Sequence, residues 1–184
     1  MSVKLQIQST PNPNALKFVL NVPVKTEGKV TYKTAAECSH NPLAQALLGV
    51  EHIHEVYFFD NYITVTQNGN GDWDALEEKI KAIILEKIEQ HDPNFKVEES
   101  AKPVVISDNP DIEKINAILD QTIRPALQMD GGDIQVIQFE GNTIKVNYQG
   151  ACGSCPSSAM GTLKAIENIL RDEFKPDVVV ELAA

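Results

Sequence analysis

Residues 134–148, IQVIQFEGNTIKVNY, decide the fold of the second half of this chain. Apolar and polar residues alternate on both sides of Gly141-Asn142, a pair that favours a turn. The pattern therefore predicts a β-hairpin that reverses at this pair. In the corresponding register, the expected cross-strand partners are Phe139 with Ile144 and Ile137 with Val146.

A helix is expected before this hairpin. Asn109 can cap the helix and Pro110 suits its first turn, whereas Pro125 should kink or end it. Residues 130–133, DGGD, have the composition of a turn that leads into the hairpin, and we interpret the two aspartates as turn and capping residues. The expected apolar face of the helix consists of Ile112, Ile115, Leu119 and Ile123.

Residues 150–156, GACGSCP, follow the hairpin and carry Cys152 and Cys155. Pro156 is expected to begin a second amphipathic helix, and residues 178–182 are expected to form a closing strand. This half should therefore contain two helices packed on a small sheet. The apolar stripe of the second helix would hold Ala159, Leu163, Ile166, Leu170 and Phe174.

The first half has strand and helix signals of its own. Residues 56–66 predict a hairpin that turns at Asp60-Asn61, with Phe58 opposite Ile63 and Val56 opposite Val65. Asp72 can cap the helix that follows, whose apolar positions are Leu76, Ile80, Ile83, Ile84 and Ile88. The other expected elements are strands over residues 3–8, 15–20 and 30–34, a turn at 10–14 and a short helix at 42–49.

The two halves are expected to be separate domains. Residues 98–109 have polar ends, an internal proline and no periodicity, which is typical of a linker. One domain would then span residues 1–97 and the other residues 110–184. The expected fold class is α+β, with two small domains that each pack helices on a small, mostly antiparallel sheet.

Composition narrows the classes of function. The 184 residues carry a formal net charge of -10, with no basic cluster, which argues against nucleic acid or an anionic membrane as a partner. No apolar run approaches the roughly 20 residues that span a bilayer. An odd number of cysteines, three, argues against a disulfide framework, and the first residues have no signal or transit pattern, so we expect a cytoplasmic protein.

Cys152 and Cys155 are the candidate functional residues. Backbone N–H groups and the helix dipole at a helix start stabilise a thiolate, which is the reactive and metal-binding form of cysteine. Gly150 and Gly153 favour an exposed loop that is open to a ligand. Three interpretations are open at this point: buried structural thiols, a redox pair in which Cys152 attacks and Cys155 resolves, and half of a metal site.

Counting ligands favours the metal site. A closed zinc or iron–sulfur site generally has four protein ligands, and this motif supplies two. The chain has no second Cys-x-x-Cys, but two copies related by a two-fold axis would supply four thiolates. The sequence thus predicts a homodimer with a shared cluster, with a dithiol–disulfide oxidoreductase and a zinc-bridged dimer as alternatives.

The second half resembles a known family. Residues 110–182, with the DGGD turn before the hairpin and GACGSCP before the helix, resemble the C-terminal domain of NifU-like (Nfu) iron–sulfur cluster scaffold proteins. Residues 3–97, with TPNPNALKF at 10–18 and the hairpin that contains Phe58-Phe59, resemble the N-terminal domain found with it in some Nfu proteins. The Cys-rich assembly domain and the ferredoxin-like domain of larger NifU proteins have no counterpart in this sequence.

The resemblance implies a carrier rather than an enzyme, with no catalytic residues. It implies that Cys152 and Cys155 bind a labile [4Fe-4S] cluster that bridges two subunits. The cluster would come from upstream cluster-assembly proteins and would be delivered to recipient apo iron–sulfur proteins, and the N-terminal domain would assist partner recognition. With no transit segment recognised, a cytoplasmic protein of bacterial type is expected.

The other residues that could bind a metal or lie near one are expected to be structural or solvent-exposed. Cys38 and His40 have no further ligand nearby, which favours a structural role. His52 and His54 would share one face of a strand, where solvent exposure is the expected state. On the helix after the motif, Lys164 and Arg171 are expected to be solvated charges that could also lie near a negatively charged cluster.

Overall fold

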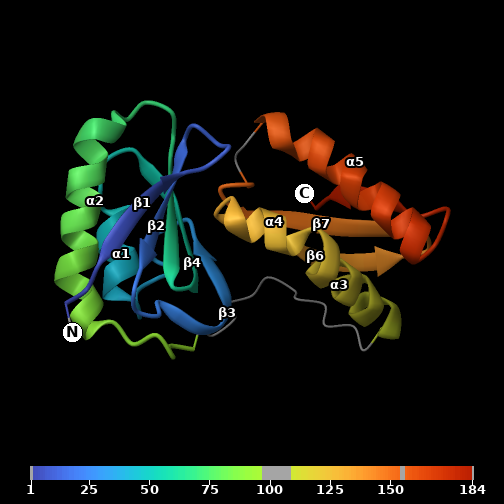
Figure 1. The fold of residues 1–184 in the computed structure, drawn as a ribbon, viewed down its shortest axis with the longest axis horizontal. Helices are drawn as coiled ribbons and strands as arrows, with labels where there is room; N and C mark the ends of the chain where they lie inside the picture. The colour runs from blue at the N-terminus through green and yellow to red at the C-terminus, as the bar shows by residue number, and fades with distance from the viewer. Residues whose placement is uncertain (1, 97–108, 154–155, 184) are drawn as a thin grey trace. The chain divides into compact units, whose positions relative to one another are not determined.

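A computed structural model describes residues 2–96, 109–153 and 156–183, and it divides the chain into two compact units within residues 1–100 and 101–184 (Figure 1). The expected linker at 98–109 lies outside the described residues, except for Asn109. Each unit has its own hydrophobic core. Among the described residues, no helix is both long and apolar enough to cross a bilayer.

The first unit is an antiparallel five-stranded sheet with helices on one face (Figure 1). The strand order is β1-β2-β5-β4-β3. The strands are β1 (Leu5–Ser9), β2 (Ala15–Leu20), β3 (Lys25–Tyr32), β4 (Ile53–Asp60) and β5 (Tyr62–Gln67). The helices are α1 (Pro42–Leu48), α2 (Trp73–Lys87) and the single 3-10 turn η1 (Ile88–Gln90).

The hairpin of the first unit is confirmed in its register. Val56 pairs with Val65 and Phe58 with Ile63, and all four side chains belong to the core under the helices. The side chain of Asp72 accepts a hydrogen bond from the Asp74 backbone N–H, which caps α2 as expected.

The third strand differs from the prediction. It was expected over residues 30–34, but β3 begins at Lys25 and ends at Tyr32. A register shift between Lys25 and Lys29 contains Gly28, whose φ of 70° is in the region that glycine tolerates best. The extra residues of the strand are mostly polar and exposed, so they carry no alternating apolar signal.

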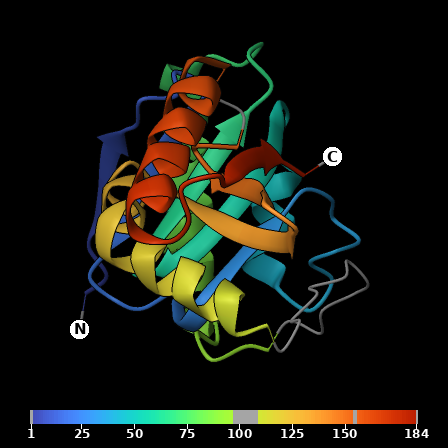
Figure 2. The same ribbon diagram turned by 90° about the vertical axis from the view of Figure 1, so that its right-hand side faces the viewer.

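The second unit packs three helices on one face of a three-stranded sheet (Figure 2). The hairpin strands are antiparallel, and the last strand runs parallel to the middle one. The strands are β6 (Gly132–Glu140), β7 (Thr143–Gly150) and β8 (Val179–Leu182), and the helices are α3 (Pro110–Thr122), α4 (Arg124–Met129) and α5 (Pro156–Glu173). Where one helix was expected before the hairpin there are two, because the helix ends before Pro125 as that residue predicts.

The hairpin of the second unit contains a β-bulge that changes its register. Phe139 faces Ile144 as predicted, but the partner of Val146 is Val136, and the predicted pairing of Ile137 with Val146 is wrong. The ladder skips a residue between Val136 and Gln138, so every pair nearer the thiol loop is moved by one position. The bulge thereby places Gly132 opposite Gly150, at the base of the loop that carries Cys152.

Candidate functional site

The loop that carries Cys152 is held against the turn that precedes β6. The Ala151 backbone N–H donates to the Gly131 carbonyl oxygen over 3.1 Å, and the Gly153 N–H donates to the Gly150 oxygen over 3.0 Å. Gly131 and Gly150 have φ values of 79° and 62°, a conformation that is costly for other residues. The DGGD turn and the thiol loop are therefore bonded directly to each other, and both depend on a glycine with positive φ.

Gly132 leaves the space in which the Cys152 sulfur lies. A Cβ atom at position 132 would lie 2.5 Å from Cys152 Sγ, 2.9 Å from its backbone nitrogen and 2.8 Å from the Gln149 oxygen. Sequence reasoning attributed the two glycines to turn flexibility and missed this contact. The contact depends on the register set by the bulge, whose only local signal is the pair of adjacent apolar residues Val136 and Ile137 that interrupts the alternation.

Adding a methyl group at this position should disturb both the fold and the thiol. We expect Gly132→Ala to lower the free energy of unfolding of the second unit by about 1–3 kcal/mol, because Cys152 and the backbone of β7 must move apart. Gly161→Ala is the matched control, since a Cβ at this exposed helical position meets no atom within 4 Å. The control should be neutral or slightly stabilising in the same denaturant titration. Equal effects of the two changes would contradict the steric role of Gly132.

Cys152 is buried, contrary to the expectation of an exposed loop. It is 7% exposed and belongs to the hydrophobic core cluster of its unit together with Tyr148. Ala151 is buried as well, at 2% exposed, whereas Gly153 is exposed. Cys155, the second predicted ligand, lies outside the described residues.

Tyr148 on β7 belongs to the surroundings of this thiol. Burial raises the pKa of Tyr148 to about 12, a hydrogen bond with Thr162 on α5 lowers it in part, and the nearby Cys152 raises it further. Tyr148 therefore keeps its proton at neutral pH. The surroundings of Cys152 therefore include a glycine, a neutral phenol and residues of the apolar core.

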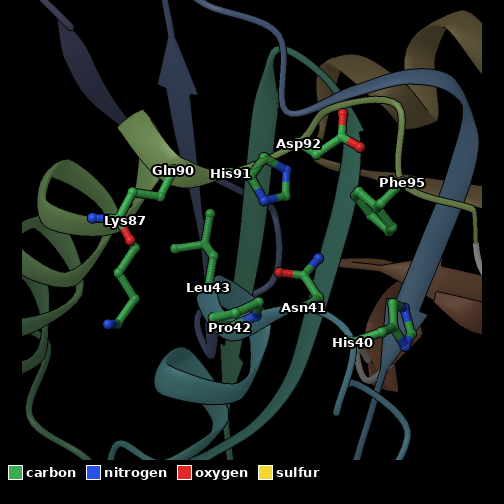
Figure 3. A pocket seen from close by; sticks show the side chains of 9 residues that line it. All are labelled: His40, Asn41, Pro42, Leu43, Lys87, Gln90, His91, Asp92 and Phe95. Atoms are coloured by element: carbon green, nitrogen blue, oxygen red, sulfur yellow. The ribbon is translucent and has the colours of Figure 1, made fainter.

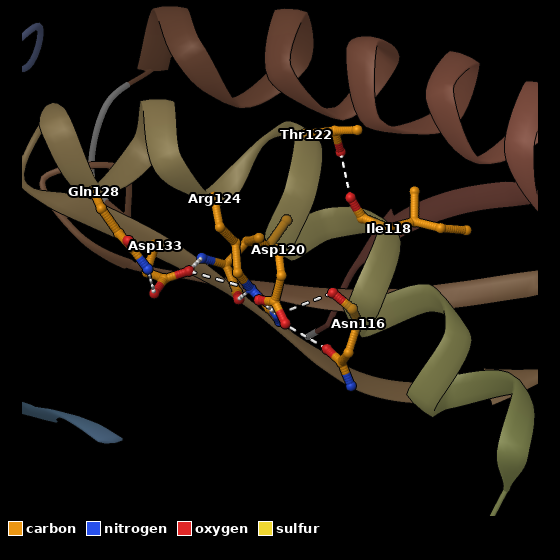
Figure 4. Close-up of polar contacts among 8 residues, drawn as sticks. Asn116, Ile118, Asp120, Thr122, Arg124, Gln128 and Asp133 are labelled. Atoms are coloured by element: carbon orange, nitrogen blue, oxygen red, sulfur yellow. Dashed lines mark hydrogen bonds and ion pairs between the residues drawn. The ribbon is translucent and has the colours of Figure 1, made fainter. Parts of the chain in front are cut away.

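A buried ion pair fixes the DGGD turn to the helices (Figure 4). Asp133 is 1% exposed, and its Oδ1 lies 3.5 Å from Nε of Arg124 at the start of α4. It also accepts hydrogen bonds from the Ile134 N–H and from the Gln128 amide. Asp133 was interpreted as a turn residue, but its carboxylate is a buried anchor, and Arg124 was missed altogether. The guanidinium of Arg124 further contacts Asn116, Asp120 and the Ile134 carbonyl oxygen.

A second polar cluster joins α5 to β8. Glu167 Oε1 lies 2.9 Å from Lys164 Nζ and 3.0 Å from a guanidinium nitrogen of Arg171, and Glu167 Oε2 accepts a hydrogen bond from the Val180 N–H. Lys164 and Arg171 are thus tied to a structural carboxylate of their own helix. Lys164 and Arg171 therefore have a structural role, because they hold the carboxylate that binds β8.

The Glu167 cluster predicts acid sensitivity of this helix–strand contact. The hydrogen bonds from Lys164 and Val180 and the charge of Arg171 lower the pKa of Glu167 below its ordinary value of 4.5. The stabilisation from Glu167 is therefore complete above pH 4.5 and is lost as the pH falls through the lower pKa of the folded state. We expect Glu167→Gln to flatten the fall in unfolding free energy between about pH 5 and 3, measured by denaturant titration. Glu173→Gln, at an exposed position of the same helix, should leave that slope unchanged.

The other candidate ligands do not gather into a site. Cys38 is fully buried in the first core, and its sulfur faces the Thr34 and Ala35 oxygens at 3.5 Å, as expected for a structural residue. His52 precedes β4 with a φ of 72°, so the expectation that it shares a strand face with His54 is wrong. Within residues 2–96, 109–153 and 156–183, no group of three or more His, Cys, Asp or Glu side chains could hold a metal ion.

Comparisons with known proteins match both units. Residues 5–91 match the family model described as "Scaffold protein Nfu/NifU N terminal", and residues 115–181 match the model described as "NifU-like domain". A Drosophila grimshawi protein named "NFU1 iron-sulfur cluster scaffold homolog, mitochondrial" is 36% identical over 91% of this chain and 57% of its own length. The human protein of the same name is 36% identical over 91% of this chain and 66% of its own length.

This chain therefore spans about three fifths of the length of such relatives. A solved structure described as a NifU-like protein from Saccharomyces cerevisiae matches with a TM-score of 0.46 and 19% identity, over 53% of this chain and 87% of that one.

Fold and site together define a class of two-domain α+β proteins in which a cysteine-bearing loop joins a hairpin to a helix in the second domain. The two family matches follow each other in the order of the two units and cover most of each. The chain belongs to the Nfu family of NifU-like proteins.

Proposed function

We propose that this protein is a non-enzymatic scaffold and carrier that binds a labile [4Fe-4S] cluster between two copies of the chain and transfers it to apo-proteins. The observation that carries the proposal is the position of Cys152, in a loop at the end of β7 that leads into α5 and is fixed to the Gly131 turn. Thiolates are the usual ligands of such clusters. Cys152 and Cys155 would supply two from each chain.

The number of thiols supports a site shared by two copies. The chain has three cysteines, and Cys38 is fully buried in the core of the first unit. One chain then offers two of the four thiolates that a [4Fe-4S] cluster requires, and a symmetric dimer offers all four. Separating the copies would halve the ligands, which suits a cluster that is meant to be released.

Two exposed methionines lie next to the thiol loop and support a contact there. Met129 ends α4 two residues before Gly131 and is 78% exposed, and Met160, near the start of α5, is 82% exposed. Methionine is a flexible apolar residue that adapts to partner surfaces. We propose that two copies of the chain would contact each other through this part of the second unit.

The partners in the proposal follow from the family, whereas the location does not. The relatives are named iron–sulfur cluster scaffold homologues, so we propose upstream cluster-assembly proteins as donors and apo iron–sulfur proteins as recipients. Those relatives are named mitochondrial, and a cytoplasmic location for this chain stays a prediction that cell fractionation can check.

The deciding experiment is anaerobic reconstitution with iron and sulfide, followed by native mass measurement and a Mössbauer spectrum. We expect a [4Fe-4S] signature and about four irons for each pair of chains. Full iron content at the mass of a single chain would contradict the shared site. Zinc instead of iron in protein purified without air would favour the zinc-bridged dimer.

The alternative class is a dithiol–disulfide oxidoreductase that uses the same two cysteines. The Cys-x-x-Cys spacing is what favours it. Turnover in an insulin-reduction assay together with failure to bind iron would replace the carrier proposal with this one.

A further inference from the structure

The two ends of helix α2 have different surroundings in the first unit. Near its C-terminal end, Lys87, His91 and Phe95 line a cavity of about 190 Å³ (Figure 3). The protein itself engages the polar ring in this cavity, because His91 Nε2 donates to the Val24 oxygen over 2.7 Å. Before the N-terminal end of α2, residues 68–71, NGNG, form a largely exposed loop that follows β5. Solvent therefore has access to two asparagine side chains in this loop.

Both asparagines precede a glycine, and such a pair can cyclise. Asn68-Gly69 and Asn70-Gly71 are the only Asn-Gly pairs in the sequence. Glycine has no Cβ, so it does not hinder the closure of a five-membered ring between its own backbone nitrogen and the carboxamide carbon of the preceding asparagine. The two pairs differ in whether that nitrogen is available.

The Asn68 carboxamide is held close to the peptide that follows it. Its Oδ1 accepts a hydrogen bond from the Asn70 N–H over 3.1 Å, which keeps the side chain folded back along the chain. The same bond stabilises the negative charge that Oδ1 acquires when the carboxamide carbon is attacked. The Gly69 N–H has no hydrogen-bond acceptor among the residues that the structure describes. The first pair therefore has a polarised carbonyl and an available nitrogen.

The second pair is protected. The Gly71 N–H donates to Oε1 of Gln67 over 2.6 Å, and Gln67 is 4% exposed. This bond must break before the nitrogen can lose its proton and attack Asn70. Packing also fixes the backbone, since a Cβ atom at position 71 would lie 2.6 Å from Cδ1 of Leu76 and 3.1 Å from Cβ of His52.

We propose that Asn68 is a site of spontaneous deamidation and that Gln67 protects Asn70 from the same reaction. The Gly69 nitrogen loses its proton and bonds to Cγ of Asn68, the bond from Cγ to Nδ2 breaks, and ammonia leaves. The product is a succinimide. Water then opens the ring, and its addition at Cγ gives aspartate, whereas its addition at the main-chain carbonyl carbon gives isoaspartate. Water is the only co-reactant.

The products change the loop permanently. Both replace a neutral amide with a carboxylate, and isoaspartate also inserts the side-chain methylene group into the main chain. The loop is anchored at both ends, because the Asn68 N–H donates to the His52 oxygen over 2.9 Å and the Gly71 N–H donates to Gln67. We therefore expect the isoaspartate form to follow a different path between these anchors, just before the α2 cap Asp72.

The test is incubation of the freshly purified full chain in mildly alkaline buffer, followed by peptide mapping in which fragmentation assigns each position. We expect Asn68 to react at least about tenfold faster than Asn70, because one hydrogen bond fewer has to break. A synthetic peptide of residues 66–73 lacks the fold and should modify both at similar rates. Digestion in heavy-oxygen water identifies modification that occurs during digestion. Equal rates in the folded chain, faster reaction of Asn70, or an intact Asn68 when the peptide has fully reacted overturns the proposal.

A variant of the protecting residue tests the selectivity. Gln67→Met keeps a similar length but removes the acceptor oxygen, so the rate at Asn70 should rise about tenfold while Asn68 keeps its rate. Gln6→Met, at an exposed position of β1, is the control and should change neither rate. Circular dichroism confirms that both variants are folded. An unchanged rate at Asn70 in folded Gln67→Met would contradict protection by Gln67, and the ratio in the unaltered chain tests the proposal even if this variant does not fold.

Isoaspartate can be detected by its own chemistry. An enzyme that transfers a labelled methyl group from S-adenosylmethionine to isoaspartate carboxylates should label the peptide that contains residues 68–71. We expect Asn68→Ser to lose this label and Asn70→Ser, which keeps the backbone N–H that binds residue 68, to retain it. The reverse pattern would refute the assignment to Asn68. These measurements contain no iron, so their outcome is independent of cluster binding at Cys152.

Discussion

Cys152→Ala is expected to abolish reconstitution of an iron–sulfur cluster. The variant removes one of the two thiolates that each chain would contribute, so a symmetric pair of chains retains two of four ligands. We expect no visible absorption band and no iron retained after desalting. The measurement is anaerobic reconstitution with iron and sulfide determined per chain, alongside the unaltered protein.

Cys38→Ala is the control for this variant, because it removes the same chemical group from the other unit. Cys38 is fully buried, and burial is the main cause that raises the pKa of its thiol, so it is held as a neutral core residue. We expect the control to load a normal amount of iron, with a loss of about 1 kcal/mol in unfolding free energy. Iron retained by Cys152→Ala but lost by Cys38→Ala would overturn the assignment of the site.

Local signals account for much of the fold. The pairing of Phe58 with Ile63 follows from alternation and a turn, both of which are contained in about a dozen residues. The caps at Asp72 and Asn109 follow from side chains that bond to backbone groups two residues away. Such features depend on neighbours in the chain, and for this reason the sequence predicts them.

Features that depend on contacts between distant segments escaped prediction. The bulge beside Ile137 adds one residue to a strand at the point where two adjacent apolar residues, Val136 and Ile137, interrupt the alternation, and the predicted register did not use this interruption. Strand β8 was expected, but its parallel pairing with β7 is set by the way α5 crosses the sheet. For β8 the deciding interaction lies many residues away along the chain.

In the candidate site, too, the sequence predicts the local features and not those that depend on packing. The chemical types at Cys152 and the glycines next to it are explicit in the sequence, and they are sufficient to suggest thiolate chemistry. The burial of Cys152 and the fit of its sulfur against Gly132 depend on the packing of two strands and two turns. The sequence therefore identifies the reactive group but not its immediate surroundings.

Arg124→Met is expected to destabilise the second unit by about 3 kcal/mol, because it removes the cation from a buried carboxylate. Asp133 would remain 1% exposed in its present position, with the Gln128 amide and the Ile134 N–H as the partners identified here. The same guanidinium also contacts α3, so its loss loosens the packing of two helices on β6. The double variant Arg124→Met, Asp133→Asn should recover part of the lost unfolding free energy, since no uncompensated charge is then buried.

Denaturant titration can assign this loss to one unit, because the chain contains a single tryptophan, Trp73, which lies in the first unit. We expect the Trp73 fluorescence transition to stay in place in Arg124→Met while the circular dichroism transition of the second unit moves to lower denaturant. The matched control is Arg171→Met, at the other arginine of the chain. Its side chain is 37% exposed and pairs with Glu167, so its loss should cost about 1 kcal/mol or less. A loss in Arg124→Met no greater than in this control would show that the Arg124–Asp133 pair does not anchor the turn beside Cys152, and the thiol loop would then depend on its glycines alone.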